Sequence, residues 1–144
     1  MNFQSVVINV ADIDRSLDFY REVFGFTLLS RKDQLAAAYA PRSEIPQVIV
    51  FRSLGTAGRV GGARHVGIRA IVLEVDSVDE LQRIEAALEA RQGIVARHSG
   101  DTWTAVFGRD PDHIAVVAGT SLGPDPIPLD AWAKLDESLY AVGE

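Results

Sequence analysis

A β-strand followed by a capped amphipathic helix occurs twice along this chain, and this repetition restricts the possible fold more than any other feature. In the first copy, residues 5–10 are rich in β-branched side chains, Asp12 occupies an N-cap position and Gly25 a C′ position. In the second copy, the apolar run 67–75 precedes a helical pattern that ends at Gly93. A supersecondary unit that returns in the same order predicts a tandem duplication.

Three short strands are predicted after each helix, so each half of the chain is expected to have the order β-α-β-β-β. In the first half these strands cover residues 26–31, 34–40 and 47–53, and in the second half 94–98, 102–107 and 113–118. Ser77 and Glu80 form the pattern of a capping box, which predicts that the second helix begins directly after Ser77.

The sequence predicts one structural domain that consists of four segments. They are a first βαβββ module at 1–53, a linker at 54–66, a second βαβββ module at 67–118, and a proline-rich segment with a C-terminal helix at 119–144. The last segment carries an apolar stripe made of Leu129, Trp132, Leu135 and Leu139. Such a stripe covers an apolar surface, and both the same chain and a second subunit are open as its partner.

Charge and composition exclude several classes of function. With a net charge of -6, the chain lacks the basic face with which nucleic-acid-binding proteins neutralise phosphates. No apolar stretch approaches the roughly 20 residues that cross a bilayer, and the first residues show no secretory signal. We therefore expect neither nucleic-acid nor membrane binding, and a cytoplasmic location. The absence of cysteine excludes disulfides, thiolate metal sites and cysteine nucleophiles.

Short motifs carry a resemblance to a known family. Residues 10–20 (Val-Ala-Asp-Ile-Asp-Arg-Ser-Leu-Asp-Phe-Tyr) precede Phe-Gly-Phe at 24–26, and further motifs follow at 74–81 (Glu-Val-Asp-Ser-Val-Asp-Glu-Leu) and 110–112 (Asp-Pro-Asp). Over residues 3–118 the chain resembles the vicinal oxygen chelate superfamily of glyoxalase, bleomycin-resistance and extradiol-dioxygenase relatives. The resemblance implies an α+β fold in which tandem βαβββ modules form a cupped, partly closed mixed sheet. It also implies a homodimer.

Metal-dependent members of that family hold a divalent ion with four ligands, one from the first and one from the last strand of each module. The resemblance places these ligands at Ser5, within 45–53, at Ala70, and at Val116 or Val117. An ion that is chelated by two substrate oxygens needs His or carboxylate ligands, and none of these positions provides one. We therefore expect neither a metal nor a cofactor.

The three histidines predict no clear metal site of their own, because they show no short-range pairing. His65, in His-Val-Gly-Ile, superficially resembles a ligand motif of the family, but it lies away from the expected position. His98, on the predicted sixth strand, is a weak candidate for a catalytic base and is better explained as a polar residue at a strand end. His113 follows the Asp-Pro-Asp turn, and this turn also explains the paired carboxylates Asp110 and Asp112.

Without a metal, the cup is expected to be an apolar cavity for a small molecule. Side chains alternate between the two faces of a strand, and this alternation selects most of the candidate lining residues. The aromatic Tyr39 and the cationic Arg52 are added as further candidates. The full set is Ser5, Val7, Asn9, Tyr39, Arg52, Ala70, Val72, Trp103 and Val116. Trp103 alternates with Ala105 and Phe107, so its ring either stacks on a planar ligand or packs into the core.

Two functions are left open by the sequence. The first is a metal-independent protein that binds an apolar or planar organic molecule, similar to the drug-sequestering members of the family. The second is a glyoxalase-like enzyme, a lyase, isomerase, cyclase or dioxygenase relative, that uses a residue such as His98 or a relocated metal site. Whether the chain is an enzyme is not decided by its sequence.

Overall fold

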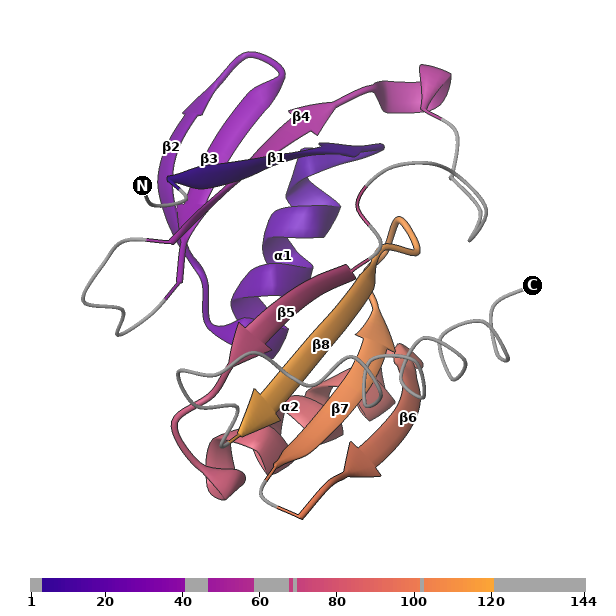
Figure 1. Cartoon of the computed structure of the whole chain (residues 1–144). Helices are drawn as coiled ribbons and strands as arrows, with labels where there is room; N and C mark the ends of the chain where they lie inside the picture. Colours follow the sequence, from indigo (N-terminus) through magenta and orange to yellow (C-terminus); the bar gives the residue numbers. More distant parts are fainter. Residues whose placement is uncertain (1–3, 41–46, 59–67, 69, 102, 121–144) are drawn as a thin grey trace. The chain divides into compact units, whose positions relative to one another are not determined.

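The chain divides into two compact units, Met1–Val60 and Gly61–Glu144. The computed structural model describes residues 4–40, 47–58, 68, 70–101 and 103–120. Each unit contains one four-stranded sheet and one long helix (Figure 1). Of the predicted proline-rich segment and C-terminal helix at 119–144, residues 119 and 120 belong to a strand and the rest lies outside the described residues.

In the first unit, five elements and a short 3-10 turn follow one another along the chain. They are β1 (Ser5–Val10), α1 (Ile13–Phe24), β2 (Thr27–Lys32), β3 (Leu35–Tyr39), β4 (Val48–Ser53) and the turn η1 (Gly55–Ala57). The strands form sheet A in the order β1-β4-β3-β2, in which β1 and β4 are parallel and the other neighbours are antiparallel. A parallel pair needs a long crossover connection, and α1 with the β2-β3 hairpin provides it.

Helix α1 begins and ends at local capping interactions. The Asp12 carboxylate accepts a hydrogen bond from the backbone N–H of Arg15 at 3.0 Å, and Gly25 ends the helix in the left-handed region with φ 74°. The buried face of the helix packs on sheet A, where the rings of Tyr20 and Phe51 lie 5.2 Å apart. This contact shows which face of sheet A the helix covers.

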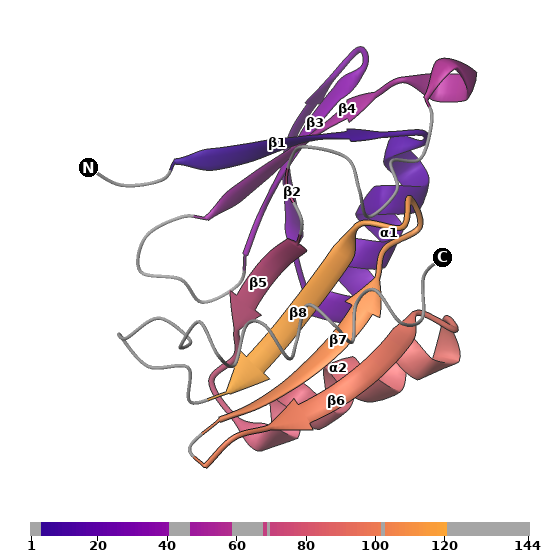
Figure 2. The same ribbon diagram turned by 45° about the vertical axis from the view of Figure 1, so that its right-hand side comes forward.

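The second unit repeats the first element by element. It contains β5 (Ala70–Glu74), α2 (Val78–Ala90), β6 (Ile94–Ser99), β7 (Thr104–Arg109) and β8 (Ala115–Thr120). Sheet B has the order β5-β8-β7-β6, with β5 and β8 parallel and the other neighbours antiparallel, and α2 lies against one face of it (Figure 2). The predicted α+β fold of two βαβββ modules is therefore confirmed, with each sheet open at its two edge strands.

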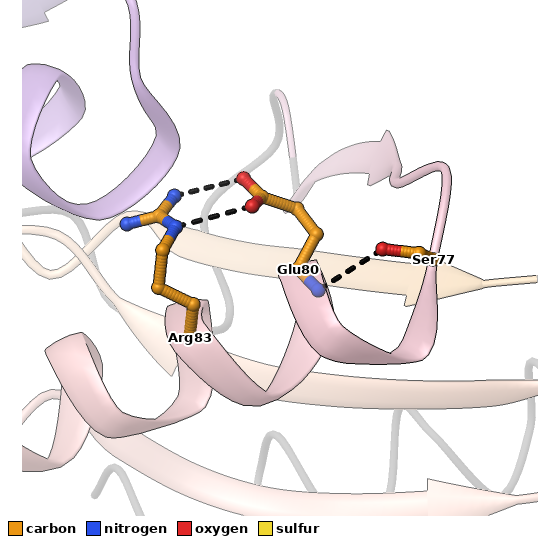
Figure 3. A network of polar contacts seen from close by, with 3 residues as sticks. All are labelled: Ser77, Glu80 and Arg83. Atoms are coloured by element: carbon orange, nitrogen blue, oxygen red, sulfur yellow. Dashed lines mark hydrogen bonds and ion pairs between the residues drawn. The ribbon is translucent and has the colours of Figure 1, made fainter.

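Helix α2 begins where the capping-box pattern predicts. The Ser77 hydroxyl accepts a hydrogen bond from the backbone N–H of Glu80 at 3.1 Å. The Glu80 carboxylate receives two hydrogen bonds from the Arg83 guanidinium, at 2.9 and 3.1 Å (Figure 3). These interactions stabilise the first turn of the helix. The buried residues of α2 are Leu81, Ile84 and Leu88.

The predicted strands are found, with differences in the end of one strand and in the pairing of two others. Strand β8 continues to Thr120, two residues beyond the predicted end at 118. Strand β2 contains a β-bulge, because Leu28 pairs with Ala38 whereas Ser30 pairs with Ala37, which leaves one extra residue between them. A register shift of the same kind occurs in β6, between residues 94 and 96.

An ion pair joins strand β2 to helix α1. Arg31 is the register partner of Ala36, which is buried on the side of the helix, and the Arg31 guanidinium donates a hydrogen bond to the Asp14 carboxylate. This hydrogen bond, together with the positive charge of Arg31, lowers the pKa of Asp14 below its ordinary value. The pair therefore connects an edge strand with few buried residues to the helix.

The Arg31→Ala variant is expected to raise the pKa of Asp14 towards the ordinary value of an aspartate, as measured by NMR titration of the side-chain carboxyl carbon. Because the folded-state pKa is lowered, the pair stabilises the protein above the ordinary pKa, and this contribution is lost as the pH falls through the lowered one. Arg21→Ala is the matched control, since Arg21 pairs with Asp18 and Glu22. An unchanged Asp14 titration in Arg31→Ala would contradict the ion pair.

Candidate functional site

Each sheet has one face that packs on its helix and one that does not. In sheet A, Ile8 of β1 is buried on the helix side, whereas the neighbouring Val7 points to the other side and is 59% exposed. Along β3 the pattern repeats, with Ala36 buried and Leu35 46% exposed. We call the face of sheet A that points away from α1 the open face of sheet A.

The strand registers arrange the open face of sheet A in three rows across its four strands. In the order β1, β4, β3 and β2, the rows are Ser5, Val48, Tyr39 and Thr27, then Val7, Val50, Ala37 and Ser30, then Asn9, Arg52, Leu35 and Lys32. The middle row is almost entirely apolar, and both outer rows combine apolar with polar residues. This surface offers an apolar centre with hydrogen-bonding and charged groups at two ends.

Five of the residues predicted from the sequence to line the site lie together on this face. They are Ser5, Val7, Asn9, Tyr39 and Arg52. Leu35, Val50 and Lys32 lie on the same face and are not among the predicted lining residues. Alternation along one strand shows which residues share a face, but the position of one strand against the next depends on register. No local signal in the sequence fixes that register.

The face of sheet B that points away from α2 has a different character. Ala70 and Val72 of β5 lie on it, paired with Ala115 and Val117 of β8. A compact apolar cluster occupies its centre, consisting of Ala105, Phe107, Ala115 and Val117, all at most 2% exposed, with Ala70, Ala96 and Trp103 packed against it. The predicted alternation of Trp103, Ala105 and Phe107 is thus seen, and Trp103 packs on this cluster.

The expectation that Val116 faces the cup is wrong. Val116 is the register partner of Gly108, and a side chain at Gly108 would meet the Leu88 methyl groups of α2. Val116 therefore packs beneath the helix, and its neighbour Val117 lies on the opposite face. The error has a simple cause, because the sequence left this position open between Val116 and Val117, and the pairing with β5, which places Val117 beside Val72, decides between them.

Two of the three histidines lie within the described residues, and they have separate environments. His98 is half-buried beside the cluster of sheet B, where its ring meets Phe107 edge-on at 5.5 Å. His113 is exposed in the turn before β8 with φ 65°, and its carbonyl accepts a hydrogen bond from Arg109. His65 lies outside the described residues.

The carboxylate of Asp110 stabilises a turn. It is buried and accepts hydrogen bonds from the backbone N–H groups of Asp112 at 2.8 Å and Ile114 at 2.9 Å. A carboxylate that binds two backbone groups two and four residues ahead closes the connection between β7 and β8. This arrangement accounts for the Asp-Pro-Asp motif without a catalytic role.

The residues at the positions of the family's metal ligands do not fit a divalent ion. On the open face of sheet A, Ser5 stands beside Val48. On sheet B, Ala70 stands beside Ala115, and Val117, one of the two predicted fourth positions, follows on the same face. A serine hydroxyl with aliphatic neighbours lacks the imidazole or carboxylate ligands that such an ion requires. Among the described residues, no three His, Asp or Glu side chains gather closely enough to hold a metal.

The helices within the described ranges show no segment that is long and apolar enough to cross a membrane. This finding is consistent with the short helices α1 and α2, which have 12 and 13 residues. A membrane-spanning helix needs about 20.

Comparison with known proteins identifies the family. A model of the Glyoxalase/Bleomycin resistance protein/Dioxygenase superfamily matches residues 2–118. No curated protein shows a significant sequence match to the chain.

Solved structures of this family share the fold at low sequence identity. A glyoxylase/bleomycin resistance protein/dioxygenase domain from Frankia sp. EAN1pec is 21% identical with a TM-score of 0.69, over 84% of this chain and 98% of that domain. Lactoylglutathione lyase from Agrobacterium tumefaciens is 20% identical with a TM-score of 0.64, over 86% and 97% of the two chains.

A third similar structure is the fosfomycin resistance protein FosX from Listeria monocytogenes, 9% identical with a TM-score of 0.64, over 83% of this chain and 93% of that one. At these sequence identities the similarity shows a shared fold only, and the names of the three proteins indicate different activities. The duplicated βαβββ architecture and the family match together show that this chain belongs to the Glyoxalase/Bleomycin resistance protein/Dioxygenase superfamily.

Proposed function

We propose that the open face of sheet A binds a small organic molecule with an apolar, planar part, and that this binding needs no metal. The observation that carries the proposal is the exposure of large apolar side chains on that face. Val7 is 59% exposed, Leu35 46% and Tyr39 36%, although all three lie on regular strands. Apolar surface of this kind gains free energy when a ligand removes it from water.

The comparison between the two sheets supports this assignment. Leu35 and Val50 of sheet A correspond by register to Ala105 and Val117 of sheet B, and these two are fully buried. The same position in the repeated module is therefore buried in the second unit and accessible in the first. We infer that the first unit offers the binding surface.

The chemistry of the open face favours a flat ligand. Val50 and Ala37 occupy the centre of the middle row, where their short side chains leave a shallow apolar floor. Tyr39 lies at one end, and its ring can stack on a planar group while its hydroxyl provides a hydrogen bond. The polar groups of Ser5 and Asn9, on the edge strand β1, can orient the ligand.

A neutral planar probe tests the proposal directly. N-phenyl-1-naphthylamine, which fluoresces in apolar surroundings, is expected to bind the protein in a saturable manner. Val7→Asp is expected to weaken its binding at least about tenfold, because a carboxylate on the apolar face must lose hydration when the probe binds. The matched control is Val78→Asp, which changes a valine of similar exposure, 55%, at the first turn of α2, where an acidic residue is tolerated.

A different result would show that another occupant covers the face. If the probe does not bind and Val7→Asp changes the mass of the protein in solution from dimer to monomer, the face belongs to an interface between two copies. Light scattering of the wild type and of both variants measures this. The homodimer implied by the family resemblance is itself a prediction that the wild-type measurement checks.

Binding of the probe is expected to be independent of metal. After treatment with EDTA and desalting, the dissociation constant for N-phenyl-1-naphthylamine should stay within about twofold of the untreated value, a free-energy change below about 0.5 kcal/mol. Elemental analysis of the protein as purified is the companion measurement. A stoichiometric zinc, iron, manganese or nickel content whose removal abolishes binding would contradict a metal-free site.

A glyoxalase-like enzyme that uses His98 is the second candidate function. The observation in its favour is the position of His98, half-buried and edge-on to Phe107 beside the apolar cluster of sheet B. An imidazole next to apolar groups is a suitable general base or acid for a small substrate. If a catalytic activity is found, His98→Ala must lower kcat at least about a hundredfold for this role to hold.

A further inference from the structure

Several positively charged side chains in the described part of the chain differ in whether they have a partner on their own unit. Arg21, Arg31, Arg83 and Arg97 each form an ion pair with a carboxylate on their own unit. Arg109 donates a hydrogen bond to a backbone carbonyl. In contrast, Lys32 and Arg52 form no ion pair or hydrogen bond through their side chains with any residue in the described part of the chain.

These two cations lie in the same row of the open face of sheet A. Arg52 on β4 is the register partner of Leu35 on β3, and Leu35 is the partner of Lys32 on β2. Two strand spacings separate their backbones by about 9.6 Å, and an extended arginine or lysine side chain is longer than half of that distance. One anionic group above Leu35 can therefore reach both charges.

The arrangement is particular to the first unit. The residues of sheet B that correspond to Arg52, Leu35 and Lys32 are Gly119, Ala105 and His98. The duplicated fold by itself therefore does not require two cations in this row. The lack of an ion-pair partner for either cation among the described residues contrasts with the net charge of -6, since carboxylates are abundant in the sequence.

We propose that the ligand of the open face is an apolar organic anion, whose acidic group is held between Arg52 and Lys32. This inference depends on the proposed binding function and adds the chemical class of the ligand. Tyr39 and Leu35 are four residues apart on β3, so their backbones are about 13 Å apart. This distance fits a ligand with two or three fused or linked rings, which stacks on Tyr39 at one end and places its acidic group between the two cations at the other. Carboxylate, sulfonate and phosphate share the chemistry that the two cations recognise.

Electrostatics sets the expected strength of this interaction. Both cations are exposed, so each charge is partly screened by water and salt. The net negative charge of the protein repels anions elsewhere on the surface. A preference for an anionic ligand must therefore come from local groups, and it should weaken as the salt concentration rises.

A pair of fluorescent probes that differ by one anionic group tests the inference. 1-Anilinonaphthalene-8-sulfonate is N-phenyl-1-naphthylamine with a sulfonate added, so the ratio of their dissociation constants isolates the contribution of the charge. The sulfonate is expected to bind about tenfold more tightly at low salt, and the advantage should shrink at 0.5 M NaCl.

Three variants locate the charge effect. Arg52→Gln and Lys32→Gln should each lower the advantage of the sulfonate about threefold, and the double variant should bring the ratio of the two dissociation constants close to one. Arg52→Lys keeps the charge and should retain most of the advantage. Arg83→Gln removes the same charge from α2, which contributes no residue to the open face, and should leave the ratio at the wild-type value. Circular dichroism confirms that each variant is folded.

The outcomes separate this inference from the proposed function. If the neutral probe binds and the sulfonate binds no more tightly, or if the double variant keeps the wild-type ratio, the anionic class of ligand is wrong and the apolar binding face stands. If neither probe binds to the wild-type protein, the proposed function itself fails. Titration with 1-naphthoate and 1-naphthyl phosphate as competitors then distinguishes a carboxylate from a phosphate ligand.

Discussion

The parallel pairing of the first and last strand in each unit is the constraint on which the rest of the structure depends. Because β1 and β4 are parallel, α1 crosses over one face of sheet A, and alternate residues of β3 and β4 are buried on that face. The residues between them are left on the other face. The same constraint acts on β5, β8 and α2. In each unit, the position of the helix thus decides which side chains are available to a ligand.

The sequence predicts the fold well where the signal is local and poorly where it is not. Asp12 and Ser77 mark both helix starts, because an N-cap interacts with backbone groups only three residues away. Alternation also places Ser5, Val7 and Asn9 on one face correctly. It fails for Val116, because the face of a residue in β8 depends on a register shared with β5 and β7. The neighbours of Arg52 on the open face could not be predicted for the same reason.

The two units share their topology and differ in the side chains on the sheet face that points away from the helix. The positions at which the family resemblance expects metal ligands include serine and aliphatic residues on the two sheets, and these side chains provide no imidazole or carboxylate. Sheet B has a buried apolar cluster around Phe107. Sheet A has exposed apolar side chains and two cations without an ion-pair partner in the described ranges. A duplicated module can diverge in this way because the helix side of each sheet maintains the fold while the other side changes.

The β-bulge in β2 has an effect on the surface that its small size does not suggest. Its extra residue shifts all later residues of the strand, so Arg31 pairs with Ala36 on the side of α1 and Lys32 with Leu35 on the open face. Without the extra residue these two adjacent cations would exchange sides. The register shift in β6 acts on Arg97 and His98 in the same manner, since Arg97 reaches Glu85 of α2. A single inserted residue thus decides which of two adjacent cations faces the ligand and which one reaches the helix, and its deletion would exchange the two without altering the net charge of the chain.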